Sequence, residues 1–374
     1  MSALAPTDAS TATPSATAEP SATAAPSASA AADELVTVFI PARDEEHTIA
    51  GVLDSVLGQT HRQLQVLVID GVSTDRTAAI VAEYAARDER VELVINPDRV
   101  IPFALNLAAD HARSRWLVRV DAHSRVPADY VERVLEHLRT RRWGGVGGRK
   151  NGVGHTATGR AIAAVMGSKF AQGNSVYHYG TEVQTVDHVP FGAYPVEVVR
   201  ELGGWSETQL VNEDFEFDYR VRLSGRELLF DPSIEIEWDC RQRIGDLFRQ
   251  YRRYGAGKVQ TLRAHPESAA LRHLAAPTMI AGLGVAAALA PWRRTRPLAA
   301  VIAAPYAAVL VAGTASVVPQ LDTPEERRAV VPAFLALHLG WGIGFWQEAW
   351  SWLRSRGRGA RSRPGMAASA GSVR

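Results

Sequence analysis

Acidic residues follow three of the segments that we expect to form β-strands. Glu45 lies just after the first of these segments, Asp70 ends the second, and Asp121 follows the fourth. Each residue alone has an ordinary structural explanation, because acidic side chains also suit helix N-termini and polar turns. Together they would lie along one edge of a parallel sheet, where the ligands of such sheets bind. Carboxylates grouped at that edge would suit a divalent cation.

Alternating strand-like and helix-like patterns surround these residues and would position them. Short runs rich in Val, Ile and Leu predict strands at residues 35–40, 64–69, 91–95 and 116–120. Apolar residues at helical spacing predict helices at residues 48–57, 78–86 and 104–112. This alternation predicts an α/β fold, with a mostly parallel sheet between two layers of helices. The rhythm fades after Asn151, so the second half of the domain is expected to differ.

The composition argues against several classes of protein. The chain has 374 residues, a formal net charge of +1 and a single cysteine, Cys240. The charge argues against binding of nucleic acid through a basic surface, and one cysteine allows no internal disulfide and no thiolate zinc site. The glycines at residues 144–148 do not open a helix after the first strand, so they form no dinucleotide fingerprint. The sequence also has no Walker lysine loop and no His-x-x-x-His pair.

Changes in composition divide the chain into four regions. Residues 1–33 consist almost entirely of Ala, Ser, Thr and Pro, which predicts a disordered tail. Residues 34–265 are expected to form the α/β domain, and residues 266–353 a set of membrane-associated helices. Residues 354–374 are expected to be a basic, disordered tail.

Three apolar stretches lie in the third region, at residues 275–291, 297–319 and 331–346. The second carries no charge and is long enough to cross a hydrocarbon layer of ~30 Å. Tryptophans crowd the end of the third stretch, as in an interfacial belt. The alternative is a helical hairpin buried in a soluble domain. Basic clusters at residues 293–296 and 354–363 favour two spans, the second and third stretches, with both clusters cytoplasmic and the first stretch interfacial or re-entrant.

Three motifs resemble those of a known family. Residues 40–46 (IPARDEE), 70–75 (DGVSTD) and 121–123 (DAH) resemble the motifs of family 2 inverting glycosyltransferases. Over residues 35–260 the chain is similar to bacterial exopolysaccharide transferases of the succinoglycan type. The resemblance implies a Rossmann-like nucleotide-sugar domain of the GT-A type, followed by transmembrane helices.

The resemblance also implies roles for residues that would bind the sugar donor. Pro41, Arg43 and Glu45 would line the nucleotide pocket, with Glu45 near the ribose, and Asp70 would bind the uracil edge. Asp121 would begin an Asp-x-Asp motif that binds the donor diphosphate through Mg²⁺ or Mn²⁺. His123 stands where the second Asp is usual. It would ligate the metal, contact phosphate or only pack beside the site, and Mn²⁺ tolerates an imidazole ligand.

Further motifs would bind the acceptor. By the same resemblance, Asp214 would be the general base that takes the acceptor's hydroxyl proton, with Glu213 also at the acceptor; the alternative is a first helical turn capped by Asn212. Trp205, after two glycines, would stack on a sugar or pack in the core. Residues 250–254 resemble a Gln-x-x-Arg-Trp motif, with a change to Tyr at the last position. In this motif Gln250 and Tyr254 would line an acceptor channel. Arg253 would clamp the diphosphate of the donor. The alternative for this segment is a basic helix lying on lipid headgroups.

These expectations describe a metal-dependent, inverting transfer of sugar from a UDP-sugar to a lipid-linked saccharide. The setting would be synthesis of an extracellular or cell-envelope polysaccharide, at the inner (plasma) membrane, with the catalytic domain cytoplasmic and no nucleic acid partner. Three alternatives stay open: a polyprenyl-phosphate sugar synthase, a sugar-1-phosphate nucleotidyltransferase, and a non-catalytic membrane scaffold, which the departures at His123 and Tyr254 would favour. The sequence specifies neither the sugar nor the linkage, and neither processivity nor oligomeric state.

Overall fold

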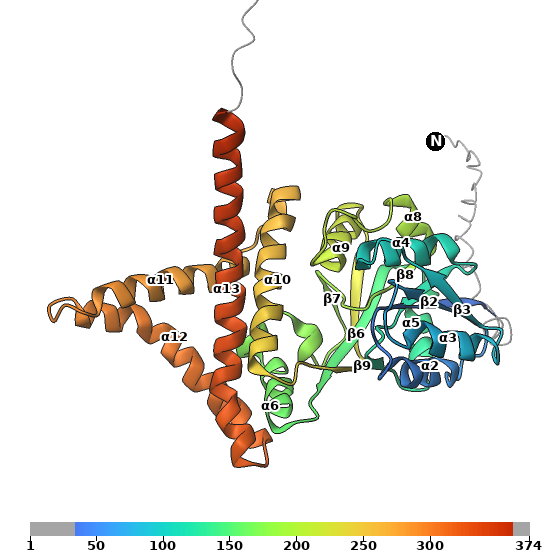
Figure 1. The fold of residues 1–374 in the computed structure, drawn as a ribbon, viewed down its shortest axis with the longest axis horizontal. Helices are drawn as coiled ribbons and strands as arrows, with labels where there is room; N and C mark the ends of the chain where they lie inside the picture. The colour runs from blue at the N-terminus through green and yellow to red at the C-terminus, as the bar shows by residue number, and fades with distance from the viewer. Residues whose placement is uncertain (1–33, 362–374) are drawn as a thin grey trace, which may run out of the picture.

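The structure, a computed structural model, describes residues 34–361. The segments expected to be disordered at residues 1–33, and the last residues of the basic tail at 362–374, lie outside this range. The chain has two parts, an α/β domain built around one sheet and a group of long helices beside it (Figure 1).

The sheet has nine strands within the described range, and its first half is parallel. The spatial order is β3 (Val91–Ile95), β2 (Leu64–Asp70), β1 (Val36–Ala42), β4 (Trp116–Arg119), β8 (Ala193–Pro195), β6 (Trp143–Val153), β9 (Glu227–Asp239) and β5 (Ser124–Arg125), with β7 (Gln184–Val186) also on β9. Strands β1 to β4 pair in parallel, as the sequence predicted, whereas β8 runs antiparallel to both β4 and β6. The loss of the parallel rhythm therefore marks the change to a mixed sheet.

Helices cover both faces of the sheet because its strands are apolar on both sides. Val36, Val38 and Ile40 of β1 pack against α2 (Ile49–Leu57), α3 (Thr77–Ala85) and α5 (Tyr130–Leu138). Phe39, which points to the opposite face, belongs to a second core with α4 (Ile101–His111), α8 (Val196–Glu201) and α9 (Glu213–Leu223). The carboxyl ends of β1, β2 and β4 thus lie at one edge of a rigid layer.

The second part consists of helices that pack beside the sheet. It contains α6 (Ala157–Met166), α7 (Lys169–Gln172), α10 (Ile244–Ala264), α11 (Ala275–Leu289), α12 (Arg296–Val317) and α13 (Pro324–Arg361), with short 3₁₀ turns at Val176–His178, Pro266–Ser268, Leu271–Leu274 and Val318–Gln320. Helix α10 runs alongside α13 (Figure 1). A Cβ atom on Gly255 would lie 1.9 Å from the Trp341 carbonyl oxygen, so glycine permits this close approach of the two helices. The domain boundary predicted at residue 265 falls just after α10, which itself is fastened to α13.

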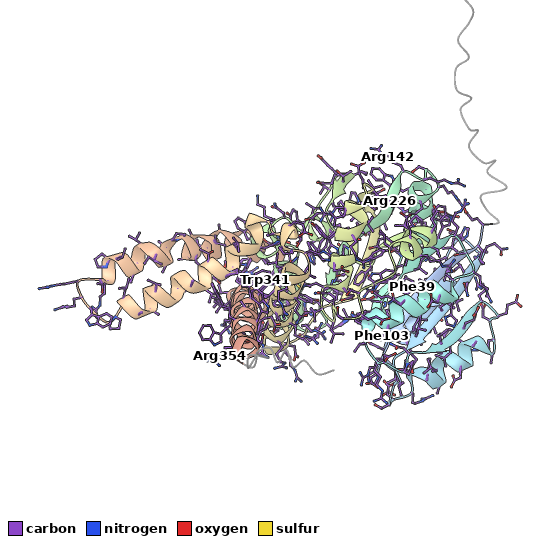
Figure 2. The ribbon with its side chains drawn as sticks, turned by 90° about the horizontal axis from the view of Figure 1, so that it is seen from above. Phe39, Phe103, Arg142, Arg226, Trp341 and Arg354 are labelled. Atoms are coloured by element: carbon purple, nitrogen blue, oxygen red, sulfur yellow. The ribbon has the colours of Figure 1, made fainter. Side chains whose placement is uncertain are left out.

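Two of these helices are long and apolar enough to cross a membrane. The most apolar 18-residue window of Arg296–Gln320 has a mean hydropathy of 2.0 and is 11% buried, and that of Pro324–Ser355 has a mean hydropathy of 1.5 and is 44% buried. The exposure of the first argues against the alternative of a buried hairpin, since apolar side chains avoid water. Figure 2 shows α11 and α12 projecting together from the rest of the molecule, with Trp341 of α13 near their base. The expected C-terminal apolar helices are confirmed, and they indicate membrane association.

One boundary differs from the prediction. The basic tail was expected to be disordered from residue 354, but α13 continues without a break to Arg361. A basic composition therefore did not distinguish a helix end from a flexible tail.

Candidate active site

One cavity of about 980 Å³ connects the end of β4 with α9, α10 and the α11–α12 hairpin. Its lining includes Asp121, His123, Glu213, Asp214, Gln250, Arg253 and Tyr254. These residues come from segments far apart in the sequence, and the fold brings them together in one space. The metal, base and acceptor positions expected from the sequence therefore share a cavity.

The residues expected to hold the nucleotide lie beside this cavity rather than in its lining. Pro41 lies next to the last residue of β1, and Asp70 is the last residue of β2. The Asp70 side chain is buried, with 2% of the residue exposed. Its carboxylate accepts hydrogen bonds from both the backbone N–H, at 3.0 Å, and the hydroxyl of Ser73. The Arg43 guanidinium donates to the Arg99 carbonyl oxygen at 3.3 Å, two residues before Ile101, which lines the cavity. In this structure the Asp70 carboxylate holds its own turn together.

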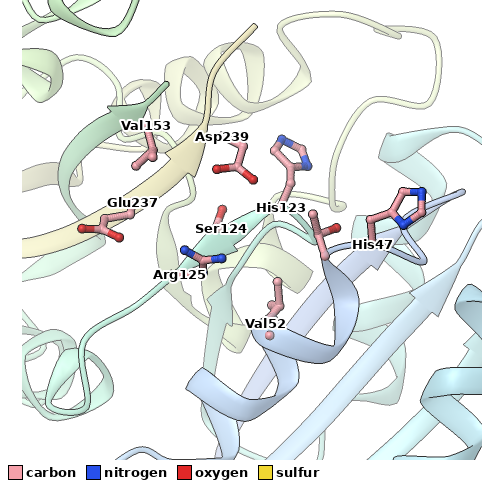
Figure 3. A pocket seen from close by; sticks show the side chains of 10 residues that line it. His47, Val52, His123, Ser124, Arg125, Val153, Glu237 and Asp239 are labelled. Carbon is pink, nitrogen blue, oxygen red and sulfur yellow. The ribbon is translucent and has the colours of Figure 1, made fainter. Parts of the chain in front are cut away.

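Glu45 links the loop after β1 to the end of β4. One of its carboxylate oxygens lies 3.2 Å from Nδ1 of His123, and the other accepts a hydrogen bond from the Thr48 hydroxyl at 2.9 Å. His123 also lines a smaller cavity of about 130 Å³, together with Ser124, Arg125 and Asp239 (Figure 3). Glu45 thus orients the imidazole at the place where the diphosphate motif was expected.

Arg119, the last residue of β4, connects the two halves of the site. Its Nε donates to Asp121 Oδ1 at 2.7 Å, and its Nη1 lies 3.7 Å from Glu213 Oε1. Burial by itself would lower the pKa of Arg119, but the charges of Asp121 and Glu213 outweigh it and raise that pKa. The guanidinium therefore remains charged while 7% exposed. Arg119 was not among the predicted site residues, although an arginine inside an otherwise apolar strand was a usable signal.

The protein side chains alone do not complete a metal site. Within residues 34–361 no group of three or more His, Cys, Asp or Glu side chains is placed to hold an ion. Asp121 and His123 offer one carboxylate and one imidazole, and at present they interact with Arg119 and Glu45. Hard cations prefer oxygen, and Mn²⁺ also accepts imidazole. This donor set fits a divalent cation whose other ligands are diphosphate oxygens and water.

Glu213 and Asp214 begin helix α9, but Asn212 does not cap it in the expected way. Asn212 has a positive φ of 60°, and its side-chain N–H donates to the Tyr254 carbonyl oxygen of α10 at 3.2 Å. The Asp214 carboxylate accepts a hydrogen bond from the Phe215 backbone N–H at 2.7 Å. Asn212 therefore fastens the start of α9 to α10, and Asp214 is fixed at the helix N-terminus.

The two adjacent carboxyls have opposite electrostatic environments. Burial and the neighbouring charge of Asp214 raise the pKa of Glu213 to about 7. Burial would also raise the pKa of Asp214, but the positive charges of His188 and Arg119 lower it below its ordinary value. Asp214 is thus the member of the pair that stays ionised, as a general base must be.

A histidine that the sequence analysis did not consider faces Asp214. Nε2 of His188 lies 3.8 Å from Asp214 Oδ2, and Nδ1 lies 2.7 Å from Asp218 Oδ2. The fully buried Asp218 carboxylate also accepts from the Val189 N–H at 2.8 Å and the Tyr194 hydroxyl at 2.7 Å. Although burial acts to lower it, the pKa of His188 is raised by Asp214 and Asp218. Asp218 therefore holds a positively polarised ring against Asp214.

Helix α10 presents the expected motif to the cavity. Gln250 is 5% exposed, and its side-chain N–H donates to the Tyr254 hydroxyl, one helical turn away, at 3.0 Å. The other side-chain atom of Gln250, Oε1, has no hydrogen-bond partner in the described part of the chain. Arg253 also lines the cavity. A buried acceptor without a partner is costly, so a donor group of a ligand would stabilise it.

Trp205 is a core residue, and its prediction as a sugar platform is wrong. The side chain is 3% exposed and lies among aromatic rings, with the Phe217 ring centroid 4.6 Å away and the Tyr194 centroid 6.0 Å away. It does not line the cavity. Gly203 and Gly204 turn the chain with φ values of 75° and 72°, which directs the indole into the core rather than outward.

We expect Trp205→Ala to act on stability. Removal of a buried aromatic side chain costs about 3–5 kcal/mol, because it leaves a cavity. The matched control is Trp292→Ala, since Trp292 is 63% exposed. The unfolding midpoint of purified protein, followed by fluorescence, should fall for the first variant and remain for the second. A stable Trp205→Ala protein with weakened binding of an acceptor would contradict the core assignment.

Sequence comparisons identify the family. A profile described as glycosyl transferase family group 2 matches residues 116–313, more than half of the chain. The chain belongs to glycosyltransferase family 2. A second profile, described as glycosyl transferase family 2, matches residues 37–186 and so includes the ends of β1, β2 and β4.

Relatives of this family 2 glycosyltransferase include proteins of polysaccharide synthesis. It is 29% identical over 327 residues to the succinoglycan biosynthesis protein ExoA of Rhizobium meliloti, which covers 85% of this chain and 97% of that protein. It is 25% identical over 238 residues to a dolichyl N-acetyl-alpha-D-glucosaminyl phosphate 3-beta-D-2,3-diacetamido-2,3-dideoxy-beta-D-glucuronosyltransferase of Methanococcus voltae, covering 61% of this chain and 74% of that one. The first of these relatives is named for the biosynthesis of succinoglycan, and the second for a glycosyl transfer.

Solved structures show the same fold. A mannosyltransferase from Pyrobaculum calidifontis, in complex with GDP-Man and Mn²⁺, has a TM-score of 0.53 at 20% identity, covering 82% of this chain and 86% of that one. GalNAc-T7 with UDP, GalNAc and Mn²⁺ has a TM-score of 0.51 at 16% identity, covering 66% and 50%. The expected GT-A fold is confirmed. Together with the family assignment, it favours a glycosyltransferase over the nucleotidyltransferase and the non-catalytic scaffold.

Proposed function

We propose that this glycosyltransferase moves a sugar, with inversion, from a UDP-sugar to a lipid-linked saccharide, using Mg²⁺ or Mn²⁺. The observation that carries this proposal is the single cavity, which begins at Asp121 and Asp214 and continues between apolar helices. A polar reaction centre and an apolar channel in one space suit an acceptor that has a sugar at one end and a lipid at the other.

The donor diphosphate would lie at the end of β4. There Asp121 and His123 would hold the cation, and Lys150 adds a positive charge between the rings of Phe191 and Trp238, at 4.5 Å and 3.9 Å from their centroids. Burial lowers the pKa of Lys150 to about 8. A cation and a lysine at this place would stabilise the charge that develops on the leaving UDP. The Mn²⁺ that is named together with GDP-Man for one structural neighbour, and together with UDP for the other, supports this assignment.

The acceptor hydroxyl would lie against Asp214. Inversion requires attack on the anomeric carbon from the side opposite the leaving group, while one base removes the hydroxyl proton. Asp214 is ionised and held by the Phe215 N–H and by the field of His188, so its oxygen has a constant position. Such a fixed base favours an in-line geometry.

The lipid would lie between the apolar helices. The cavity wall contributed by α11, α12 and α13 consists mainly of apolar side chains, among them Met279, Leu283, Ile302, Val309 and Leu337. The dolichyl phosphate named for the Methanococcus voltae relative supports a polyprenyl-linked acceptor. A membrane-held enzyme meets such an acceptor at a high local concentration. We place the catalytic domain on the cytoplasmic side of the plasma (inner) membrane, as the basic clusters favour.

The function is tested with the full chain in lipid, a panel of UDP-sugars, Mn²⁺ or Mg²⁺, and a membrane lipid extract. We expect an oligosaccharide-lipid product and its loss when EDTA removes the cation. A monosaccharide phospholipid as the product would instead identify a polyprenyl-phosphate sugar synthase. Turnover only with a GDP-sugar, or full turnover in EDTA, would contradict the donor or metal assignment.

A large side chain introduced into the channel should impair use of the lipid-linked acceptor. Gly282 of α11 lines the cavity, and a Cβ there would lie 3.6 Å from the Ile302 side chain. A leucine at this position would compete with the bound lipid for the same space. Such steric conflict costs about 1–3 kcal/mol, so Gly282→Leu should reduce kcat/KM for this acceptor by roughly 10- to 100-fold. Hydrolysis of the UDP-sugar should not change.

Gly284→Leu on the same helix is the matched control. A Cβ at Gly284 would meet nothing within 4 Å, and this glycine is not part of the cavity wall. Its kcat/KM should equal that of the unmodified protein. An unchanged kcat/KM in Gly282→Leu would contradict a lipid in this channel, and equal losses in both variants would mean that leucine disturbs α11 itself.

A further inference from the structure

The ring of Phe215 marks the place where the reaction centre meets the apolar channel. On one side, its centroid lies 5.7 Å from that of His188, which faces Asp214. On the other side, it lies 6.0 Å from that of His273, which is followed almost directly by α11. A ligand that extends from Asp214 into the channel must therefore pass this ring.

A buried lysine lies over this ring. The Lys258 Nζ is 3.2 Å from the Phe215 ring centroid, and the residue is 7% exposed and lines the cavity. Within the described range it forms no ion pair with a carboxylate closer than 4.0 Å. Burial lowers the pKa of Lys258 to about 7. An ammonium group without a counter-charge is costly to bury, and the aromatic face compensates only in part.

Lys150 and Lys258 have different neighbours near the base: Lys150 lies over the rings of Phe191 and Trp238, and Lys258 lies over the ring of Phe215. Asp214 is within electrostatic range of both lysines, whereas Asp121, at the donor end, acts on Lys150. The donor diphosphate would use Lys150 and the cation. Lys258 is consequently placed for a second anionic group, on the acceptor side of Asp214.

We infer that Lys258 binds the phosphate of the acceptor, the group that joins its sugar to its lipid. This inference rests on the proposed function and adds a subsite to it. A phosphate at Lys258 leaves the sugar on the Asp214 side of Phe215 and directs the lipid toward α11. It also supplies a counter-charge in direct contact with the buried ammonium, which no carboxylate of the described residues provides within 4.0 Å.

The test measures binding of four probes to the full chain in detergent: farnesyl diphosphate, farnesol, inorganic pyrophosphate, and UDP with Mn²⁺. In Lys258→Met we expect farnesyl diphosphate to bind about 10- to 100-fold more weakly, because a charged hydrogen bond is lost. Farnesol and UDP should bind as to the unmodified protein, and pyrophosphate should bind more weakly than farnesyl diphosphate. Lys258→Arg should keep most of the affinity.

The control is Lys169→Met, which removes an exposed lysine that also lies near an aromatic ring, that of Phe170, and does not line the cavity. Three results would overturn the inference. If Lys258→Met lost affinity for UDP as much as for farnesyl diphosphate, Lys258 would belong to the donor site, and an equal loss for farnesol would indicate a change in the shape of the channel. If the unmodified protein bound pyrophosphate as tightly as farnesyl diphosphate, the site would be one for free anions. If the unmodified protein transfers sugar to a lipid-linked acceptor while Lys258→Met binds farnesyl diphosphate normally, only this inference fails. If the unmodified protein neither binds that probe nor uses a lipid-linked acceptor, the proposed function fails as well.

Discussion

Asp214→Asn is expected to lower kcat for sugar transfer by about a thousandfold, within the range of 10²–10⁴ that general bases contribute. The amide keeps the shape of the side chain and its contact with the Phe215 N–H but cannot take the hydroxyl proton. Binding of UDP should not change, because the nucleotide would lie at the ends of β1, β2 and β4. The measurement is the rate of transfer at saturating donor and acceptor.

Glu213→Gln is the control that the chain itself offers, since Glu213 precedes Asp214 on the same helical turn. The raised pKa of Glu213, about 7, means that its neutral form is already well populated near neutral pH. We therefore expect Glu213→Gln to lower kcat for sugar transfer by less than about tenfold, which is less than a general base contributes. The reverse result, with Asp214→Asn active and Glu213→Gln inactive, would assign the base to Glu213.

Arg119→Met is expected to destabilise the protein by about 3–5 kcal/mol, because it leaves buried carboxylates without their partner. Asp121 and Glu213 both lie against this guanidinium, at 2.7 Å and 3.7 Å. Arg133→Met is the matched control, since Arg133 pairs with Asp129 on the surface, where solvent screens an ion pair and its loss has little effect on stability. Thermal unfolding of the two variants compares them directly. Equal midpoints would show that Arg119 has no structural role.

The same substitution should shift the dependence of activity on pH. Arg119 lowers the pKa of Asp214, so its removal raises that pKa. A base must lose its proton to act, and a raised pKa moves the acid limb of kcat to higher pH. Arg119→Lys keeps the charge and should keep the limb near its original position. An unmoved acid limb in Arg119→Met would mean that another group controls it.

The local pattern of the sequence was sufficient for the first half of the domain. The predicted strands at residues 35–40 and 64–69 correspond to β1 and β2, and the carboxylates after them lie at one edge of the sheet. Strand and helix periodicity depends on neighbours within a few residues, and parallel pairing then places the carboxyl ends of these strands at the same edge of the sheet. Chemistry at that edge could therefore be expected without a structure.

Burial decided the outcomes that the sequence left open. Trp205 follows a glycine turn in either case, but only the packing of Phe217 and Tyr194 around it makes it a core residue. A side chain's exposure depends on segments that a local pattern does not contain.

By itself, the sequence determined the family, the α/β layer and the apolar C-terminal helices, and it predicted the residue types of the reaction centre. Only the tertiary structure decided their partners: Arg119 between Asp121 and Glu213, the Asp218–His188 pair behind Asp214, and Lys258 over Phe215. The physical reason is that charge interactions depend on distance and burial, and these pairs form between strands and helices that meet only after folding.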